Sequence, residues 1–63
     1  MPKTDIVVDL TESDGNAFMI MGKVARALKK GGYPELVDAF YKEAQSGDYD
    51  HLLRTAMEYV EVE

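Results

Sequence analysis

Turn-forming residues divide this chain into segments of helical length, and their spacing constrains the fold more than any other feature of the sequence. Gly31-Gly32 and Ser46-Gly47-Asp48 interrupt the apolar periodicity, and Pro34 follows the first interruption closely. Glycine, proline and short polar residues at such positions end one helix and begin the next. We therefore expect three helices with short connections, over about residues 16–30, 34–45 and 49–59.

Each expected helix has apolar residues at helical spacing, which predicts one core-facing side per helix. In the first helix these residues are Ala17, Phe18, Ile20, Met21, Val24, Ala25, Ala27 and Leu28. In the second they are Leu36, Val37, Phe40, Tyr41 and Ala44, and in the third Tyr49, Leu52, Leu53, Ala56, Met57 and Val60. Thr55 falls on the polar side of the third helix. Among the tyrosines, we expect Tyr33 to be the most exposed.

Two glycines have specific expected roles. Gly22 lies inside the first helix, where glycine costs about 1 kcal/mol relative to alanine. Close approach of another backbone is the usual compensation, so we expect tight packing there. Gly47 is expected to end the second helix in a left-handed conformation, with Asp48 capping the third helix.

The two ends of the chain have strand-like patterns. Residues 6–10 are rich in β-branched side chains, and residues 60–63 alternate valine with glutamate. A lone strand is not stable, so each end is the plausible partner of the other. We expect an α+β fold, with three short helices and a small two-stranded sheet that pairs the N- and C-terminal segments. The alternative is an all-α three-helix bundle.

The chain is long enough for only one hydrophobic core. With 63 residues and no cysteine, it is expected to bury about 60% of the surface of its unfolded form, without disulfides to support the fold. We expect a single small domain over residues 1–63. The N-terminus lacks the apolar stretch of a signal peptide and no apolar run reaches membrane-spanning length, which predicts a cytoplasmic location and no membrane partner.

The sequence contains no recognisable catalytic or cofactor motif. Its glycines match neither the dinucleotide fingerprint nor the phosphate-binding loop, which need glycines at fixed offsets. His51 is the single histidine and the best candidate for chemistry, with Asp48 and Asp50 nearby. A histidine in the first turn of a helix, on its polar side, is more often a solvated surface residue. We expect no catalytic residue, cofactor or metal site, and therefore no enzyme.

An acidic surface is expected on the sheet. Twelve acidic and seven basic residues give a net charge of −5, which disfavours general binding to nucleic acid. If the apolar side chains of residues 6–10 and 60–63 face the helices, the alternating acidic residues face outward. This acidic sheet face consists of Asp5, Asp9, Glu61 and Glu63. It could hold a hard cation or imitate phosphate charges toward a basic protein, and such groups are also a common device for solubility and edge protection.

The first helix has the opposite charge. Lys23, Arg26 and Lys30 follow one stripe, Met19 lies among them, and the helix contains no acidic residue. We call Met19, Lys23, Arg26 and Lys30 the basic stripe. The helix dipole accounts for cations in the last turn, so Lys23 and Arg26 are the informative members. The stripe is either a solvated face or a contact for phosphate or a partner, and we expect it to lie away from the acidic sheet face.

Three stretches of the chain together resemble a known family. They are Asp14-Gly15-Asn16-Ala17-Phe18, the segment Val24 to Leu28, and Ser46-Gly47-Asp48-Tyr49-Asp50-His51-Leu52-Leu53. The chain resembles small uncharacterised proteins encoded in phages, prophages and bacterial genomes, which often end in a Trp/Tyr-Val-Glu-Val-Glu-like tail. The resemblance extends from about Asp14 to Glu63. It implies an accessory protein of mobile elements and no assigned activity or ligand.

Three functions of different classes fit these features. The first is a non-catalytic protein-interaction module with an unknown protein partner, acting alone or as a homo-oligomer. The second is an acidic mimic that inhibits a nucleic-acid-binding host protein through the acidic sheet face. The third is weak nucleic-acid binding through the basic stripe, against which the net charge argues.

Overall fold

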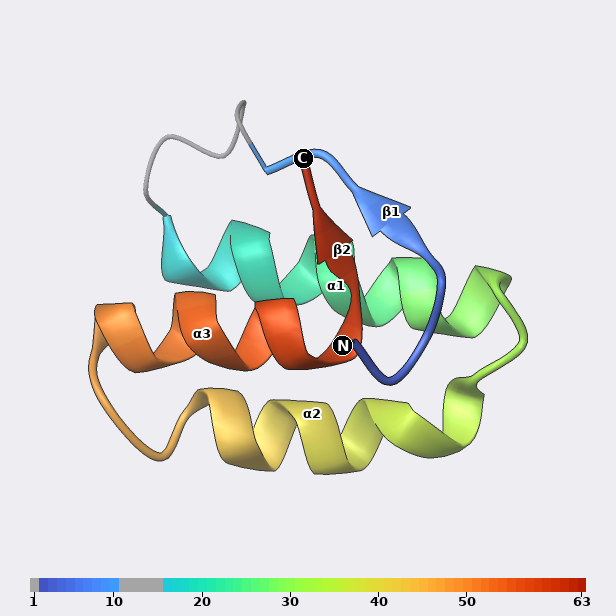
Figure 1. Ribbon diagram of the computed structural model, residues 1–63. Coiled ribbons are helices and arrows are strands. Elements are labelled where there is room, and N and C mark those ends of the chain that lie inside the picture. The colour runs from blue at the N-terminus through green and yellow to red at the C-terminus, as the bar shows by residue number, and fades with distance from the viewer. Residues whose placement is uncertain (1, 11–15) are drawn as a thin grey trace.

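The computed structural model describes residues 2–10 and 16–63 of the chain. The elements in order are β1 (Val7–Val8), α1 (Ala17–Lys30), a 3-10 turn η1 (Pro34–Leu36), α2 (Val37–Ala44), α3 (Tyr49–Tyr59) and β2 (Glu61–Val62). The two strands lie side by side, with β1 against α1 and β2 against α3 (Figure 1). The α+β prediction is confirmed, including the pairing of the two chain ends. The expected second helix begins as the 3-10 turn and becomes α-helical only at Val37.

The two strands are parallel, with Val7 opposite Glu61 and Val8 opposite Val62. Parallel neighbours need a crossover connection, which here consists of the three helices. Each strand has only two residues and is therefore shorter than its expected segment, 6–10 or 60–63. The expected alternation is present, because Val8 and Val60 are buried whereas Val7 and Glu61 are exposed.

Pairing of the chain ends extends beyond the regular ladder. The Lys3 N–H donates to the Glu58 carbonyl at 2.7 Å, and the Thr4 N–H donates to the Tyr59 carbonyl at 3.2 Å. The Thr4 hydroxyl also donates to the Tyr59 carbonyl, at 2.7 Å, and accepts from the Ile6 N–H at 3.2 Å. Thr4 is buried, so these bonds satisfy polar groups that water does not reach.

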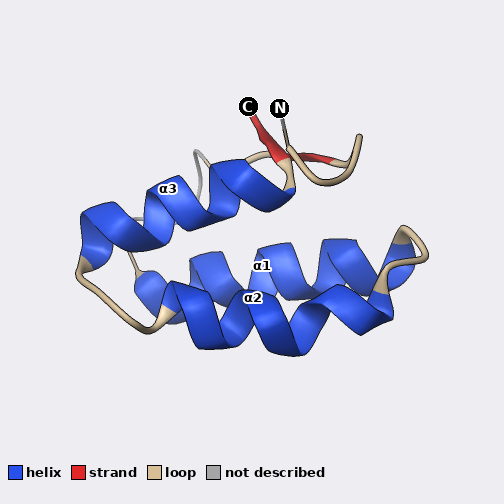
Figure 2. Cartoon of the chain, turned by 60° about the horizontal axis from the view of Figure 1, so that its bottom comes forward, coloured by secondary structure: helices blue, strands red, loops and turns tan. Residues whose placement is uncertain are grey.

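The three helices pack against one another (Figure 2), and the largest fully buried side chain of the core is that of Phe40. The Phe40 ring is fully buried and meets the Tyr59 ring edge to face, with ring centroids 5.4 Å apart. This geometry suits the quadrupoles of the two rings. The Lys3 ammonium group lies 5.4 Å from the centroid of the Tyr59 ring, within range of a cation–π contact. The N-terminal segment therefore covers the core as well as pairing with β2.

Both ends of α1 are fixed by local hydrogen bonds. The Asn16 side chain accepts from the backbone N–H of Phe18 and of Met19, as an N-cap does. At the other end, Gly32 has a φ of 92°, and the Tyr33 N–H donates to the Leu28 carbonyl at 2.8 Å. This is the Schellman arrangement, which requires a residue in the left-handed region. The conformation explains why glycine is found at position 32.

Three residues predicted to be core are exposed. Phe18 is 82% exposed, Met57 52% and Tyr49 41%. An apolar stripe estimated from helical periodicity is wider than the side that neighbouring elements cover, so residues at its margins stay in contact with water. Tyr49, rather than Tyr33, is the most exposed tyrosine, because Tyr33 packs partly against the core.

The prediction for Thr55 was also wrong, in the opposite direction. Its side chain is 1% exposed, and its hydroxyl donates to the His51 carbonyl one turn earlier at 2.8 Å. A threonine that bonds within its own helix can be buried without leaving a polar group unsatisfied. Thr55 lies three residues after Leu52 and four before Tyr59, both of which are buried, so helical spacing places it on the buried side of α3 even though its side chain is polar.

Both glycine predictions need correction. Nothing lies within 4 Å of the position that a Cβ would take on Gly22, so no backbone packs closely against it. Gly47 is not left-handed, because among the described residues only Gly32 has a positive φ. A Cβ on Gly47 would lie 2.8 Å from the Cγ of His51. Glycine is found at this position because the imidazole ring lies against the backbone.

Candidate functional site

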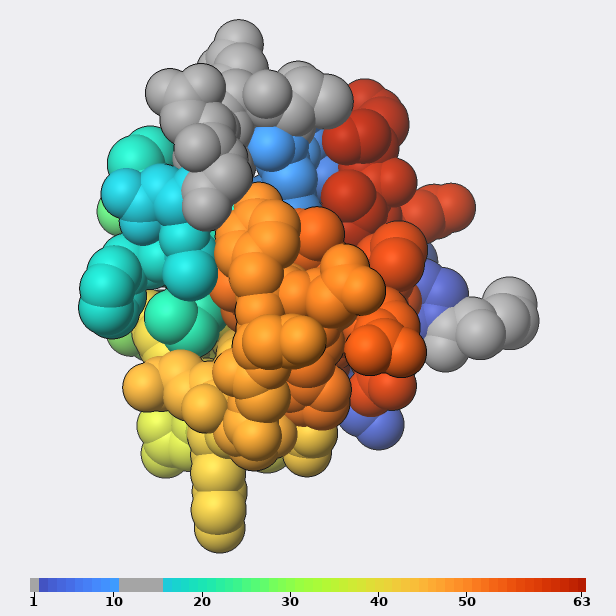
Figure 3. All heavy atoms as spheres, turned by 90° about the vertical axis from the view of Figure 1, so that its left-hand side faces the viewer, coloured from blue at the N-terminus to red at the C-terminus, as the bar shows by residue number. Residues whose placement is uncertain are grey.

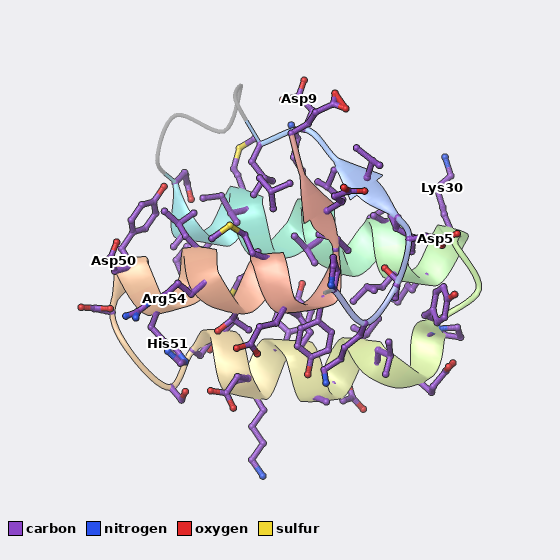
Figure 4. All side chains as sticks on the ribbon, in the orientation of Figure 1. Asp5, Asp9, Lys30, Asp50, His51 and Arg54 are labelled. Carbon is purple, nitrogen blue, oxygen red and sulfur yellow. The ribbon has the colours of Figure 1, made fainter. Side chains whose placement is uncertain are left out.

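The basic stripe borders an open groove between α1 and β1. The groove has a volume of about 270 Å³, and its lining consists of Val7, Val8, Asp9, Lys23, Arg26, Ala27 and Lys30. Arg26 and Lys30 are exposed, and Figure 4 shows Lys30 extending away from the body of the molecule. Met19, although it belongs to the stripe, does not line the groove. The structure thus brings three of the four predicted residues together with the first strand.

The basic stripe and the acidic sheet face are not separated as expected. The Lys23 ammonium group donates to the backbone carbonyl of Asp9 at 3.0 Å. Asp9 itself lines the groove. The expectation failed because charge patterns within single elements do not show how the strand lies across the helix. The groove therefore has cations on its helical side and an acidic residue at one end.

The acidic sheet face has the predicted orientation. Its four members, Asp5, Asp9, Glu61 and Glu63, are all exposed. Their apolar neighbours in sequence, Ile6, Val8 and Val62, pack in or against the core. In the described part of the chain, the structure contains no group of three or more His, Cys, Asp or Glu residues able to hold a metal ion.

A second hollow lies at the opposite end of the helices, beside Phe18. It has a volume of about 330 Å³ and lies between the start of α1 and the turn from α2 to α3. Its lining consists of Ala17, Phe18, Met21, Ala44, Gln45, Gly47, Asp48, Tyr49 and Leu52. Figure 3 shows this end of the molecule, with the start of α1 in cyan beside the start of α3 in orange. We call it the Phe18 hollow. Helical periodicity missed it because Phe18 and Tyr49 were both predicted to be core.

His51 belongs to a polar cluster across the α2–α3 turn (Figure 4). Its Nε2 atom lies 3.0 Å from the Glu43 carboxylate, 3.0 Å from the Glu43 carbonyl and 3.1 Å from the Ser46 hydroxyl. The Ser46 hydroxyl in turn donates to the Glu43 carbonyl at 2.7 Å. The Asp48 carboxylate caps α3 by accepting from the His51 N–H at 2.9 Å. The contacts of His51 with Glu43 and Ser46 were not predicted from the sequence.

The cluster differs from a serine hydrolase triad in one decisive respect. In such a triad, the histidine contacts the nucleophile through one ring nitrogen and the acid through the other. Here Ser46 and Glu43 both face Nε2, so the acid cannot orient the ring as a base for the serine. The residues instead satisfy the exposed carbonyl at the end of α2. Ser46 and His51 line neither the groove nor the Phe18 hollow.

No helix within residues 2–10 and 16–63 combines the length and the apolar character that crossing a membrane requires. Comparison with known proteins adds no relative: no family model, curated protein or solved structure matches this chain. The resemblance to phage and bacterial proteins therefore stays a prediction.

Proposed function

We propose that this chain is a non-catalytic protein-interaction module that binds a partner protein through the Phe18 hollow. The observation that carries the proposal is the 82% exposure of Phe18 beside a hollow with several apolar lining residues. A large aromatic side chain loses favourable burial energy when it stays in water. Aromatic residues beside apolar pockets are the residues that contribute most to protein–protein binding.

Two further features support a protein partner. Tyr49, on the other side of the hollow, is also exposed and offers an apolar ring with a polar hydroxyl, a combination enriched at interfaces. The single histidine takes part in closing a turn, as its contacts with Glu43 show. The resemblance to accessory proteins of mobile elements suggests a host or phage protein as the partner.

The test is quantitative affinity capture with a matched pair of variants. Phe18→Ser removes the aromatic ring at the hollow, whereas Met57→Ser removes an exposed apolar side chain that does not line it. Both residues are exposed, so both variants are expected to fold. We expect a partner, or a second copy of the chain, to be retained by the original protein and by Met57→Ser, and at least tenfold less by Phe18→Ser.

Two outcomes would contradict the proposal. The first is equal loss of the partner in both variants, which would indicate nonspecific apolar adhesion. The second is a partner retained by Phe18→Ser but lost when Glu61 and Glu63 are replaced by glutamine. That result would favour the acidic mimic, which the joint exposure of Asp5, Asp9, Glu61 and Glu63 supports as the second candidate.

A further inference from the structure

The outer edge of β1 is the edge that faces away from β2. The Glu61 N–H donates to the Ile6 carbonyl at 2.8 Å, and the Glu63 N–H donates to the Val8 carbonyl at 2.9 Å. Because successive carbonyls of an extended strand point in opposite directions, the Val7 carbonyl points away from β2. Within residues 2–10 and 16–63 the sheet has only two strands, so this edge of β1 has no neighbouring strand. The groove described above lies along it.

Lys23 shows that hydrogen-bond donors reach this edge. Its ammonium group donates to the Asp9 carbonyl, which follows Val7 by two residues. Lysine beside a strand edge is a known device that discourages unwanted pairing. The bond is made by a flexible and only half-buried side chain, so an arriving strand can displace it.

The groove also has unpaired positive charge. Within the described residues, the single ion pair joins His51 and Glu43. Neither Arg26 nor Lys30 therefore has a described carboxylate within 4.0 Å of its charged group. Lys23, Arg26 and Lys30 follow one stripe of α1, at the spacing that keeps side chains on one helical face. The open strand edge and the cations thus form two sides of one groove.

We infer that this groove binds an extended acidic segment of a partner protein, which adds to the outer edge of β1 as a third strand. This is β-augmentation, in which main-chain hydrogen bonds supply affinity and alternate side chains supply specificity. The residue that pairs with Val7 directs its side chain outward beside the Val7 side chain, so an apolar residue fits there. The residues on either side of it point toward α1, where acidic side chains meet the cations.

The chemistry of the groove favours a short acidic peptide over nucleic acid. A polynucleotide continues its negative charge beyond the groove, where it meets Asp5, Glu61 and Glu63 of the acidic sheet face. A peptide places a few charges only where the cations are. The exposed Val7 side chain and the strand edge also suit a peptide backbone. The inference rests on the proposed function only in taking the partner to be a protein, and it uses a different surface.

The experiment measures binding of a fluorescent heptapeptide, Glu-Val-Glu-Val-Glu-Val-Glu, by anisotropy at low ionic strength. We expect saturable binding to the original protein and at least tenfold weaker binding to Arg26→Glu/Lys30→Glu. Lys42→Glu is the control, matched in charge to the single variant Arg26→Glu, because Lys42 is an exposed lysine on α2 away from the groove. Lys42→Glu should weaken binding by less than about threefold, and Arg26→Glu by more. If circular dichroism shows that the double charge reversal unfolds the chain, Arg26→Gln/Lys30→Gln replaces it, with Lys42→Gln as control.

Two modified peptides test the pairing itself. Methylation of the backbone nitrogen of every residue after the first removes the donors that face Val7 in either strand direction, and should weaken binding at least tenfold while leaving the side-chain charges unchanged. A peptide with lysine in place of glutamate should not bind. The inference is overturned if the methylated peptide binds as well as the original, or if no saturable binding occurs at millimolar peptide. It is also overturned if Lys42→Glu weakens binding as much as the double variant.

Two further samples separate this inference from its alternatives. A single-stranded oligonucleotide of matched charge should bind more weakly than the peptide. If it binds more tightly, and Arg26→Glu/Lys30→Glu abolishes that binding, the ligand of the groove is nucleic acid and not an acidic peptide. Phe18→Ser should bind the peptide normally. Normal peptide binding together with a failed capture experiment would reject the Phe18 hollow and keep the groove, whereas the reverse result would reject only the groove.

Discussion

Thr4 joins the two ends of the chain through its hydroxyl. The group donates to the Tyr59 carbonyl and accepts from the Ile6 N–H, and Thr4 is only 6% exposed. Thr4→Val keeps the shape but removes the hydroxyl, which leaves the Ile6 N–H without this partner. We expect the free energy of unfolding to fall by about 1–2 kcal/mol, measured by urea denaturation.

The control for Thr4 is Thr55, a second buried threonine. Its hydroxyl bonds only to the His51 carbonyl within the same helix. Thr55→Val should lower the free energy of unfolding by about 0.5 kcal/mol or less, because the backbone of α3 keeps its hydrogen bonds without the hydroxyl. Equal losses for Thr4→Val and Thr55→Val would contradict the role given to Thr4.

Residues that act across a turn were the hardest to predict from the sequence. The contact between His51 and Glu43 spans eight positions and depends on the path of the backbone between α2 and α3. Gly47 is a local hint, because a glycine can mark either a left-handed turn or a close neighbour, and only the structure shows that the His51 ring lies close to it. Without coordinates, Gly47 was interpreted as an ordinary helix terminus.

At the scale of the helix, Gly22 and Gly32 make a matched pair for testing α1. Nothing lies within 4 Å of a Cβ built on either residue. Gly22→Ala should therefore raise the free energy of unfolding by about 0.5–1 kcal/mol, because alanine favours the helix interior. Gly32→Ala should lower it by about 1–2 kcal/mol, because its φ of 92° lies in the left-handed region. Urea denaturation of both variants measures the two changes in the free energy of unfolding. Changes of the same sign would contradict this account of α1.

Helix boundaries were predictable because local chemistry fixes them. Asn16 caps α1, Asp48 caps α3, and Gly32 ends α1, and each of these signals is a residue type at the helix end. The covered side of each helix was less predictable. Periodicity grouped Phe18 and Met57 with the core, but whether a marginal residue is covered depends on where the neighbouring elements lie. Whether the two strands run parallel or antiparallel likewise depends on the path of the three helices that connect them.

At the scale of the whole molecule, the fold presents two distinct surfaces that a partner could use. The groove beside β1 has cations and an open strand edge, and the Phe18 hollow at the other end has exposed aromatic side chains. A chain of 63 residues has a small core. Each large apolar side chain that stays exposed, such as that of Phe18, therefore leaves unburied a considerable part of the apolar surface available to stabilise the fold. The charges of the groove were visible in the sequence, whereas the hollow was not.

The most direct test of the central claim is amide NMR of the isotopically labelled chain, recorded with and without its purified partner. Binding through the Phe18 hollow predicts that the largest shift changes fall in residues 17–21 and 44–49, which line or adjoin it. The same titration with Phe18→Ser should give at least tenfold weaker binding. A partner that binds while residues 17–21 and 44–49 keep their shifts would contradict the account.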